Sequence, residues 1–118
     1  MARHGLRKLT PRKCQLLLAA LLESYPEELP CGYLMEVRVC GDCAAGFAYR
    51  ASGFDAGEAV ATDVIVEVCR YPGRWLLRTR SCGCWVVVNF APGGRQSLLR
   101  LVELFESARL AQSKWCLH

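Results

Sequence analysis

The chain has 118 residues, the usual size of a single domain, and 53% of them are hydrophobic whereas 22% are charged. This composition is too apolar for an intrinsically disordered protein and is sufficient to build a continuous core. The longest apolar runs, 16–22 and 85–88, are much shorter than the roughly 20 residues that a membrane-spanning helix needs, so we expect no membrane span.

Basic residues are concentrated at the start of the sequence. The formal net charge is +4, and five of the 15 lysines and arginines lie within residues 1–13, which contain no acidic residue. We therefore predict a basic N-terminal arm over residues 1–10 and a single domain over residues 11–118. No aromatic residues alternate with these charges, so we expect contact with nucleic acid only through this arm.

A helix is predicted to follow the arm. Thr10 is suited to the N-cap and Pro11 to the first helical position. Five apolar residues then recur at the spacing of one helical face: Cys14, Leu17, Leu18, Leu21 and Leu22. The basic and apolar segments together also have the outline of a secretory signal, but residues 23–28 contain no small-x-small cleavage site. We therefore favour a core helix in an intracellular protein.

The middle of the chain predicts one strand and one long loop. Apolar residues alternate with other residues over 33–39, which is typical of a half-buried strand. Residues 46–62 contain three glycines among small side chains, and this composition predicts a long mobile loop.

Three further strands are expected as a meander over 64–69, 75–80 and 84–90, with a tight turn at 71–74. The continuous apolar run at 85–88 is typical of a central strand that is covered on both faces.

A second helix is predicted over residues 96–110, because four apolar side chains share one of its faces: Leu98, Leu101, Val102 and Phe105. Together the elements predict an α+β fold. Its antiparallel sheet has about four strands, and an N-terminal and a C-terminal helix pack on one face of that sheet.

The eight cysteines are the most unusual feature of the composition. Two closely spaced pairs fall at predicted turns, and zinc takes four such thiolates in a tetrahedron. We therefore predict a structural zinc ion with four ligands: Cys40, Cys43, Cys82 and Cys84. Buried thiols without a metal are the alternative interpretation.

A redox function is a second alternative. The strand that leads into Cys40-Gly-Asp-Cys43 resembles the CGxC segment of thioredoxin-like and selenoprotein-W-like folds, where the following helix stabilises the first thiolate. Cys40 would then be the attacking thiol and Cys43 the resolving thiol of a dithiol oxidoreductase. This alternative needs a regular helix after the motif, where the chain has Gly46 and further glycines.

A secreted ligand is the third alternative. The order of six cysteines resembles that of cystine-knot growth factors: Cys31, Cys40, Cys43, Cys69, Cys82 and Cys84. The chain departs from that family in having CGDC in place of CxGxC, and in continuing with a strand and a helix after the last pair.

A longer segment is similar to one viral family. Residues 40–94 contain Cys-x-x-Cys-Ala, then Arg-Trp-Leu, Cys-x-Cys and Gly-Gly, in the order found in the cysteine-rich segment of adenoviral early-region-four adaptor proteins. That resemblance implies a host-interaction protein that recruits a ubiquitin ligase through elongin C. The intervening length is larger here, and the paired histidines of the family are missing.

The predicted second helix also resembles a groove-binding helix of that family and of lentiviral infectivity factors, through Ser97-Leu98 and the residues up to Val102. Five residues are therefore candidate partner contacts: Trp75, Leu98, Leu101, Val102 and Phe105. The alternative is that the four helical side chains belong to the core. The loop 46–62 and the hairpin turn 71–74 are further candidate surfaces.

The two histidines, His4 and His118, stand at the ends of the sequence, and no nucleophile–base pair can be proposed. We therefore expect a small zinc-stabilised adaptor or regulatory domain that binds protein partners, rather than an enzyme. The sequence leaves the partner and a homo-oligomeric state open.

Overall fold

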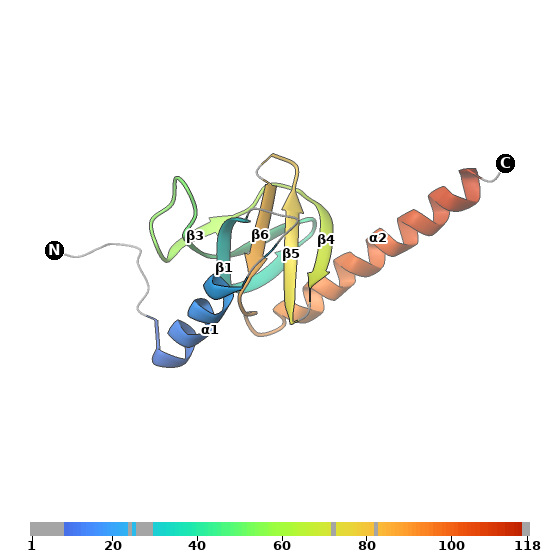
Figure 1. Ribbon diagram of the computed structural model, residues 1–118. Coiled ribbons are helices and arrows are strands. Elements are labelled where there is room, and N and C mark those ends of the chain that lie inside the picture. The colour runs from blue at the N-terminus through green and yellow to red at the C-terminus, as the bar shows by residue number, and fades with distance from the viewer. Residues whose placement is uncertain (1–8, 24, 26–29, 72, 82, 117–118) are drawn as a thin grey trace.

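The computed structural model describes residues 9–23, 25, 30–71, 73–81 and 83–116, with residues 110–116 described by their backbone alone. The elements follow in the order α1 (Pro11–Leu22), β1 (Pro30–Cys40), β2 (Cys43–Tyr49), β3 (Glu58–Ala61), β4 (Ile65–Tyr71), β5 (Arg74–Thr79), β6 (Gly83–Val87) and α2 (Gly94–Cys116) (Figure 1).

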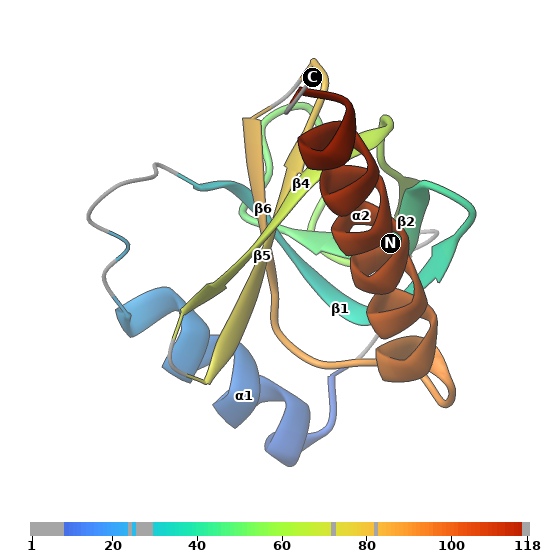
Figure 2. The ribbon, with the colours of Figure 1, turned by 90° about the vertical axis from the view of Figure 1, so that its right-hand side faces the viewer.

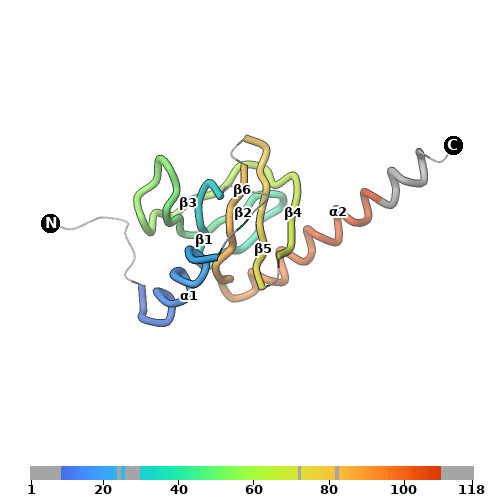
Figure 3. The backbone as a smooth tube through the Cα atoms, in the orientation of Figure 1, coloured from blue at the N-terminus to red at the C-terminus, as the bar shows by residue number. Residues whose placement is uncertain are grey.

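The strands form one six-stranded sheet in the order β3-β2-β1-β6-β5-β4. Strands β1 and β6 pair in parallel, and the other neighbours pair antiparallel. The backbone trace in Figure 3 shows β3 and β4 at the two ends of this sheet. The predicted α+β class with a helix near each end is confirmed. The expectation of about four antiparallel strands is wrong, because the described residues form six strands with one parallel pair.

The glycine-rich segment 46–62 is the source of this error. It holds the end of β2 and the whole of β3 instead of one long loop. A Cβ atom at Gly46 would lie 2.8 Å from the carbonyl oxygen of Met35, a distance that real Cβ contacts essentially never show. Gly46 therefore lets β2 approach β1 closely within a strand, so this glycine marks packing rather than mobility.

A bulge in β1 changes the face on which its side chains lie. Glu36 adopts a φ of 56°, and the register with β2 shifts between Met35 and Arg38. As a result Met35 packs into one core cluster and Val37 into the other. The predicted alternation over 33–39 therefore holds on each side of the bulge but not across it.

The two helices cover opposite faces of the sheet, so the prediction that both pack on one face is wrong (Figure 2). Ala20 of α1 belongs to the cluster that contains Val86 of β6, whereas Leu98 of α2 belongs to the cluster that contains Trp85 and Val87. The β6 side chains from Cys84 to Val87 are all buried, and the sheet order places β6 near its centre. This confirms the predicted central strand with two covered faces.

Helix α1 begins as predicted but presents a different face to the sheet. Thr10 caps it by accepting a hydrogen bond from the Lys13 N–H at 3.2 Å. Ala20 is fully buried, whereas the side chains of Leu18 and Leu22 are 56% and 83% exposed. Nearly every side chain after the first turn is apolar, so periodicity does not fix the rotation of this helix. The ion pair between Lys13 and Glu36, 2.6 Å long, helps to set it.

Helix α2 is longer than predicted and continues outward past the sheet (Figure 1). Its first turn is attached to β1, because the Val39 N–H donates to Ser97 Oγ at 2.9 Å. Leu98 and Leu101 are 0% and 4% exposed, which fixes this part of the helix on the core. Among the described residues, neither helix is long and apolar enough to cross a membrane.

Candidate functional site

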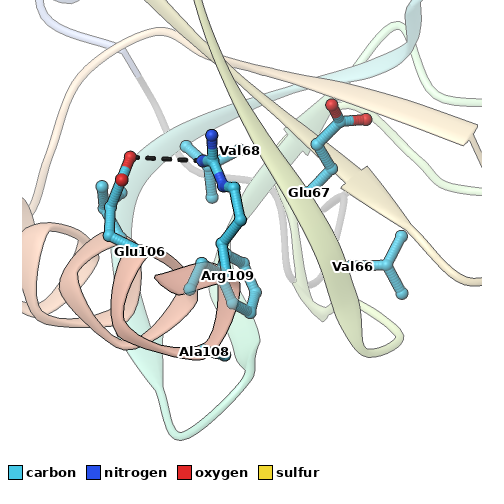
Figure 4. Close-up of a pocket in the computed structure, with 8 residues that line it drawn as sticks. Val66, Glu67, Val68, Glu106, Ala108 and Arg109 are labelled. Carbon is cyan, nitrogen blue, oxygen red and sulfur yellow. Dashed lines mark hydrogen bonds and ion pairs between the residues drawn. The ribbon is translucent and has the colours of Figure 1, made fainter. Parts of the chain in front are cut away.

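A groove runs between β4 and α2, with a volume of about 510 Å³ (Figure 4). Its walls come from these two elements alone: Val66, Glu67 and Val68 from β4, and Val102, Phe105, Glu106, Ala108 and Arg109 from α2.

The groove stays open because α2 rests on β1, whereas β4 is the last strand of the sheet. Val102 and Phe105 reach the core only in part and are half-buried. Val66 is 48% exposed, so β4 also presents an aliphatic side chain to solvent. The groove therefore combines aliphatic and aromatic side chains from both elements with three charged ones, Glu67, Glu106 and Arg109.

Each charged side chain that lines the groove has a charged partner. Arg109 and Glu106 form an ion pair at 3.3 Å on α2, drawn as a dashed line in Figure 4. Glu67 forms an ion pair with Arg78 of β5 at 2.8 Å. All four side chains are well exposed, so each pair contributes little to stability. A ligand in this groove does not have to supply a compensating charge.

The outer edge of β4 is the second feature of the groove. On its inner side β4 pairs with β5 in a register that matches Val68 with Leu77. On its outer side the described chain adds no further strand, and Ile65 alone donates to Asp42 O at 2.7 Å, at the start of the strand. An outer edge of this kind offers backbone N–H and C=O groups to an added strand.

The predicted partner contacts are divided between the core and two surfaces. Leu98 and Leu101 lie in the core cluster and are buried. Val102 and Phe105 line the groove, and Trp75 lines a different hollow on the β4–β5 hairpin. Val66 and Val68 were missed as groove residues, because the alternation of valines gives no sign that β4 is an outer strand.

Cys40 and Cys43 are brought together as the last paired residues of the β1–β2 hairpin. The turn between them has Gly41 at its first central position with a φ of 64°, a conformation that favours glycine. Desolvation raises the pKa of the Cys43 thiol, and its hydrogen bond to Asp42 and the nearby carboxylates raise it further. Cys43 is therefore held mainly as the thiol near neutral pH.

The structure places a strand, not a helix, after the CGDC motif, because Cys43 begins β2. The helix N-terminus that stabilises the first thiolate in thioredoxin-like folds therefore has no counterpart directly after Cys43. The dithiol activity itself stays a prediction.

The predicted zinc ligands are only partly described. Cys40 and Cys43 lie at an exposed hairpin end, whereas Cys84 is 2% exposed and packs in the core cluster on the α1 side. Cys82 lies outside the described residues. Within the described part of the chain, no group of three His, Cys, Asp or Glu side chains is arranged to hold a metal ion.

The two hairpins that carry these cysteines do meet at one segment. The Ile65 N–H donates to Asp42 O of the β1–β2 turn at 2.7 Å, and the Arg80 N–H donates to Val64 O at 2.9 Å. Residues 64–65 therefore lie beside both turns, and the zinc site stays a prediction.

No protein-family model, curated protein or solved structure matches this chain. The resemblance of residues 40–94 to the adenoviral adaptor proteins, and the ubiquitin-ligase partner that it implies, therefore stay predictions.

Proposed function

We propose that this chain is a protein-interaction domain that binds an extended peptide segment of a partner protein in the groove between β4 and α2. The observation that carries the proposal is the coincidence of an outer strand edge with an open apolar helix face. Val66 and Val68 lie on one wall of the groove, and Val102 and Phe105 on the other.

The backbone of β4 favours an extended ligand over a compact one. A peptide that adds to the outer edge of a sheet gains main-chain hydrogen bonds, and its alternate side chains point to one face. Those side chains would contact Phe105 and Val102, which are only half-buried in the free chain. We therefore expect apolar residues at alternate positions of the ligand.

The lining itself is suited to binding rather than to chemistry. It consists of aliphatic and aromatic side chains with Glu67, Glu106 and Arg109 at the rim, and it includes no cysteine, histidine or hydroxyl group. Its ionic groups are paired with each other or with Arg78.

The test begins with a phage-displayed library of random 12-residue peptides, selected on the purified chain. Selected peptides are expected to share an alternating apolar pattern and to shift the NMR amide signals of residues 66–68 and 102–109. Val66→Lys is expected to weaken binding at least tenfold, because it adds a charged side chain to the strand edge with which the peptide would pair. Val66 is already exposed, so this variant is expected to fold.

Leu104→Lys is the control, since Leu104 is 65% exposed on α2, the helix that forms the other wall, but does not line the groove. Equal weakening by both variants, or peptides that shift signals elsewhere, would overturn the proposal. A dimer that Val66→Lys dissociates, measured by analytical ultracentrifugation, would make a second copy the occupant and would also contradict it.

A further inference from the structure

A second hollow, separate from the groove, lies where the β4–β5 hairpin meets the start of α2, and its volume is about 400 Å³. Nine residues line it: Arg70, Gly73, Arg74, Trp75, Val87, Val88, Asn89, Phe90 and Arg95. Three of these are arginines from three different segments, and none is acidic.

Two of the arginines are held by aromatic rings that also line the hollow. The guanidinium carbon of Arg70 lies 4.4 Å from the ring centre of Trp75, and that of Arg95 lies 4.9 Å from the ring centre of Phe90. Such stacking orients a guanidinium plane while its N–H groups remain available as donors. Within the described residues, neither Arg70 nor Arg95 forms an ion pair.

The third arginine, Arg74, is held by an ion pair with the residue that follows α1. The Arg74 Nε donates to Glu23 Oε1 at 2.9 Å, and the Arg74 side chain is only 11% exposed. Among the residues that the structure describes, Glu23 balances the charge of Arg74, and no carboxylate pairs with Arg70 or Arg95. The described lining of the hollow, with Glu23 counted, therefore carries an excess of two positive charges.

This excess is local. Residues 14–118 contain ten basic and eleven acidic residues, so the body of the chain is close to neutral. A chain that tracks a nucleic-acid backbone spreads its basic residues along a path, whereas here three arginines converge on one hollow. The ligand that matches two unpaired guanidinium groups is a compact dianion.

We propose that this hollow binds a phosphate monoester, carried either by a small molecule or by a phosphorylated side chain. Arg70 and Arg95 would donate to its oxygens, and bidentate pairing of this kind is the strongest hydrogen bonding that arginine makes. Helix α2 begins at Gly94, so the positive end of its dipole lies beside Arg95 and adds to the attraction. A carboxylate carries one charge and would leave one of the two arginines unbalanced.

The experiment is an NMR titration that follows the Nε–Hε signals of Arg70, Arg74 and Arg95. The probes are inorganic phosphate, N-acetyl-O-phosphoserine amide and AMP, at constant ionic strength, with N-acetylserine amide as the uncharged control. Saturable shifts of the three arginine signals are expected with all three phosphates and not with the serine amide. Preference for AMP would identify a nucleotide as the source, and preference for phosphoserine a modified protein.

Two variants test the assignment. Arg70→Gln and Arg95→Gln are each expected to weaken phosphate binding by roughly tenfold or more, since each loses a charged hydrogen bond. Arg100→Gln is the matched control, because it removes the same charge from an exposed position of α2 outside the hollow. The proposal is overturned if no saturable shift occurs, or if Arg100→Gln weakens binding as much as the other two. Thermal melting of each variant checks that it is folded.

Discussion

The side chain of Asn89 holds the bulge of β1 in place, because its Oδ1 accepts a hydrogen bond from the Glu36 N–H at 2.8 Å. Glu36 has a φ of 56°, and the next N–H, that of Val37, donates to the Asn89 backbone oxygen at 3.0 Å. Asn89, two residues after the end of β6, therefore accepts hydrogen bonds from two successive N–H groups of β1. A left-handed conformation at a glutamate costs free energy, and these two hydrogen bonds stabilise it.

Asn89→Ala is expected to lower the free energy of unfolding by about 1–3 kcal/mol, since it leaves the Glu36 N–H without its acceptor in a part-buried site. Asn89→Asp keeps an acceptor at the same position, so we expect a smaller loss. Urea denaturation followed by circular dichroism measures both. If the two variants are equally destabilised, the hydrogen bond to Glu36 does not hold the bulge.

Gly46→Ala is expected to destabilise the chain by about 1–3 kcal/mol, because the new methyl group would meet the Met35 carbonyl oxygen at 2.8 Å. Gly46→Val is expected to cost more, since its branches add to the same clash. The free energies of unfolding of both variants test this order. Unchanged stability in Gly46→Val would show that β2 does not lie so close to β1.

The stability of the fold is expected to fall at high pH through Tyr25. Burial, together with its hydrogen bond to Glu23, raises the pKa of Tyr25 to about 12. The unfolded chain loses this proton near pH 10. The contribution of Tyr25 to the free energy of unfolding is therefore complete below pH 10 and is lost as pH rises towards 12. Tyr25→Phe should remove this part of the pH dependence, measured as the difference in melting temperature between the two proteins. Parallel pH profiles would contradict the assignment.

Metal analysis tests the zinc prediction directly. If Cys40, Cys43, Cys82 and Cys84 hold zinc, the purified chain contains one zinc per molecule, and Cys43→Ser loses it and unfolds. The Cys43 position is the informative one, because Cys84 is buried in the core and its replacement would destabilise the chain without any metal. A metal-free chain, or a folded Cys43→Ser variant, would exclude the site.

Local signals in the sequence predicted much of the fold. The cap at Thr10, the meander from β4 to β6 and the apolar face of α2 each depend on residues within one element or one turn. The bulge at Glu36 and the strand around Gly46 could not be predicted in this way. Both depend on atoms of another strand, and the sequence of either segment alone does not contain that information.

The candidate sites also differ in whether local sequence signals or contacts between distant segments define them. Val102 and Phe105 were recognised from helical periodicity, although periodicity could not separate them from the core residue Leu98. The arginine hollow was missed, since Arg70 and Arg95 lie 25 positions apart in the sequence. They converge because the hairpin that carries Arg70 and the first turn of α2 meet beside the end of β6.

The parallel pairing of β1 with β6 has a consequence for folding. It divides the sheet into two three-stranded antiparallel units, β1–β3 and β4–β6. Within each unit, strands pair only with strands that are adjacent to them in the sequence. The strand pairs that join the two units link residues about 50 positions apart, as Tyr33 and Val86 do. Closing so long a loop is slow relative to forming a hairpin. The two halves are thus expected to assemble first and to join last along one seam, and a cut in residues 62–64 would turn that seam into an interface between two separate fragments.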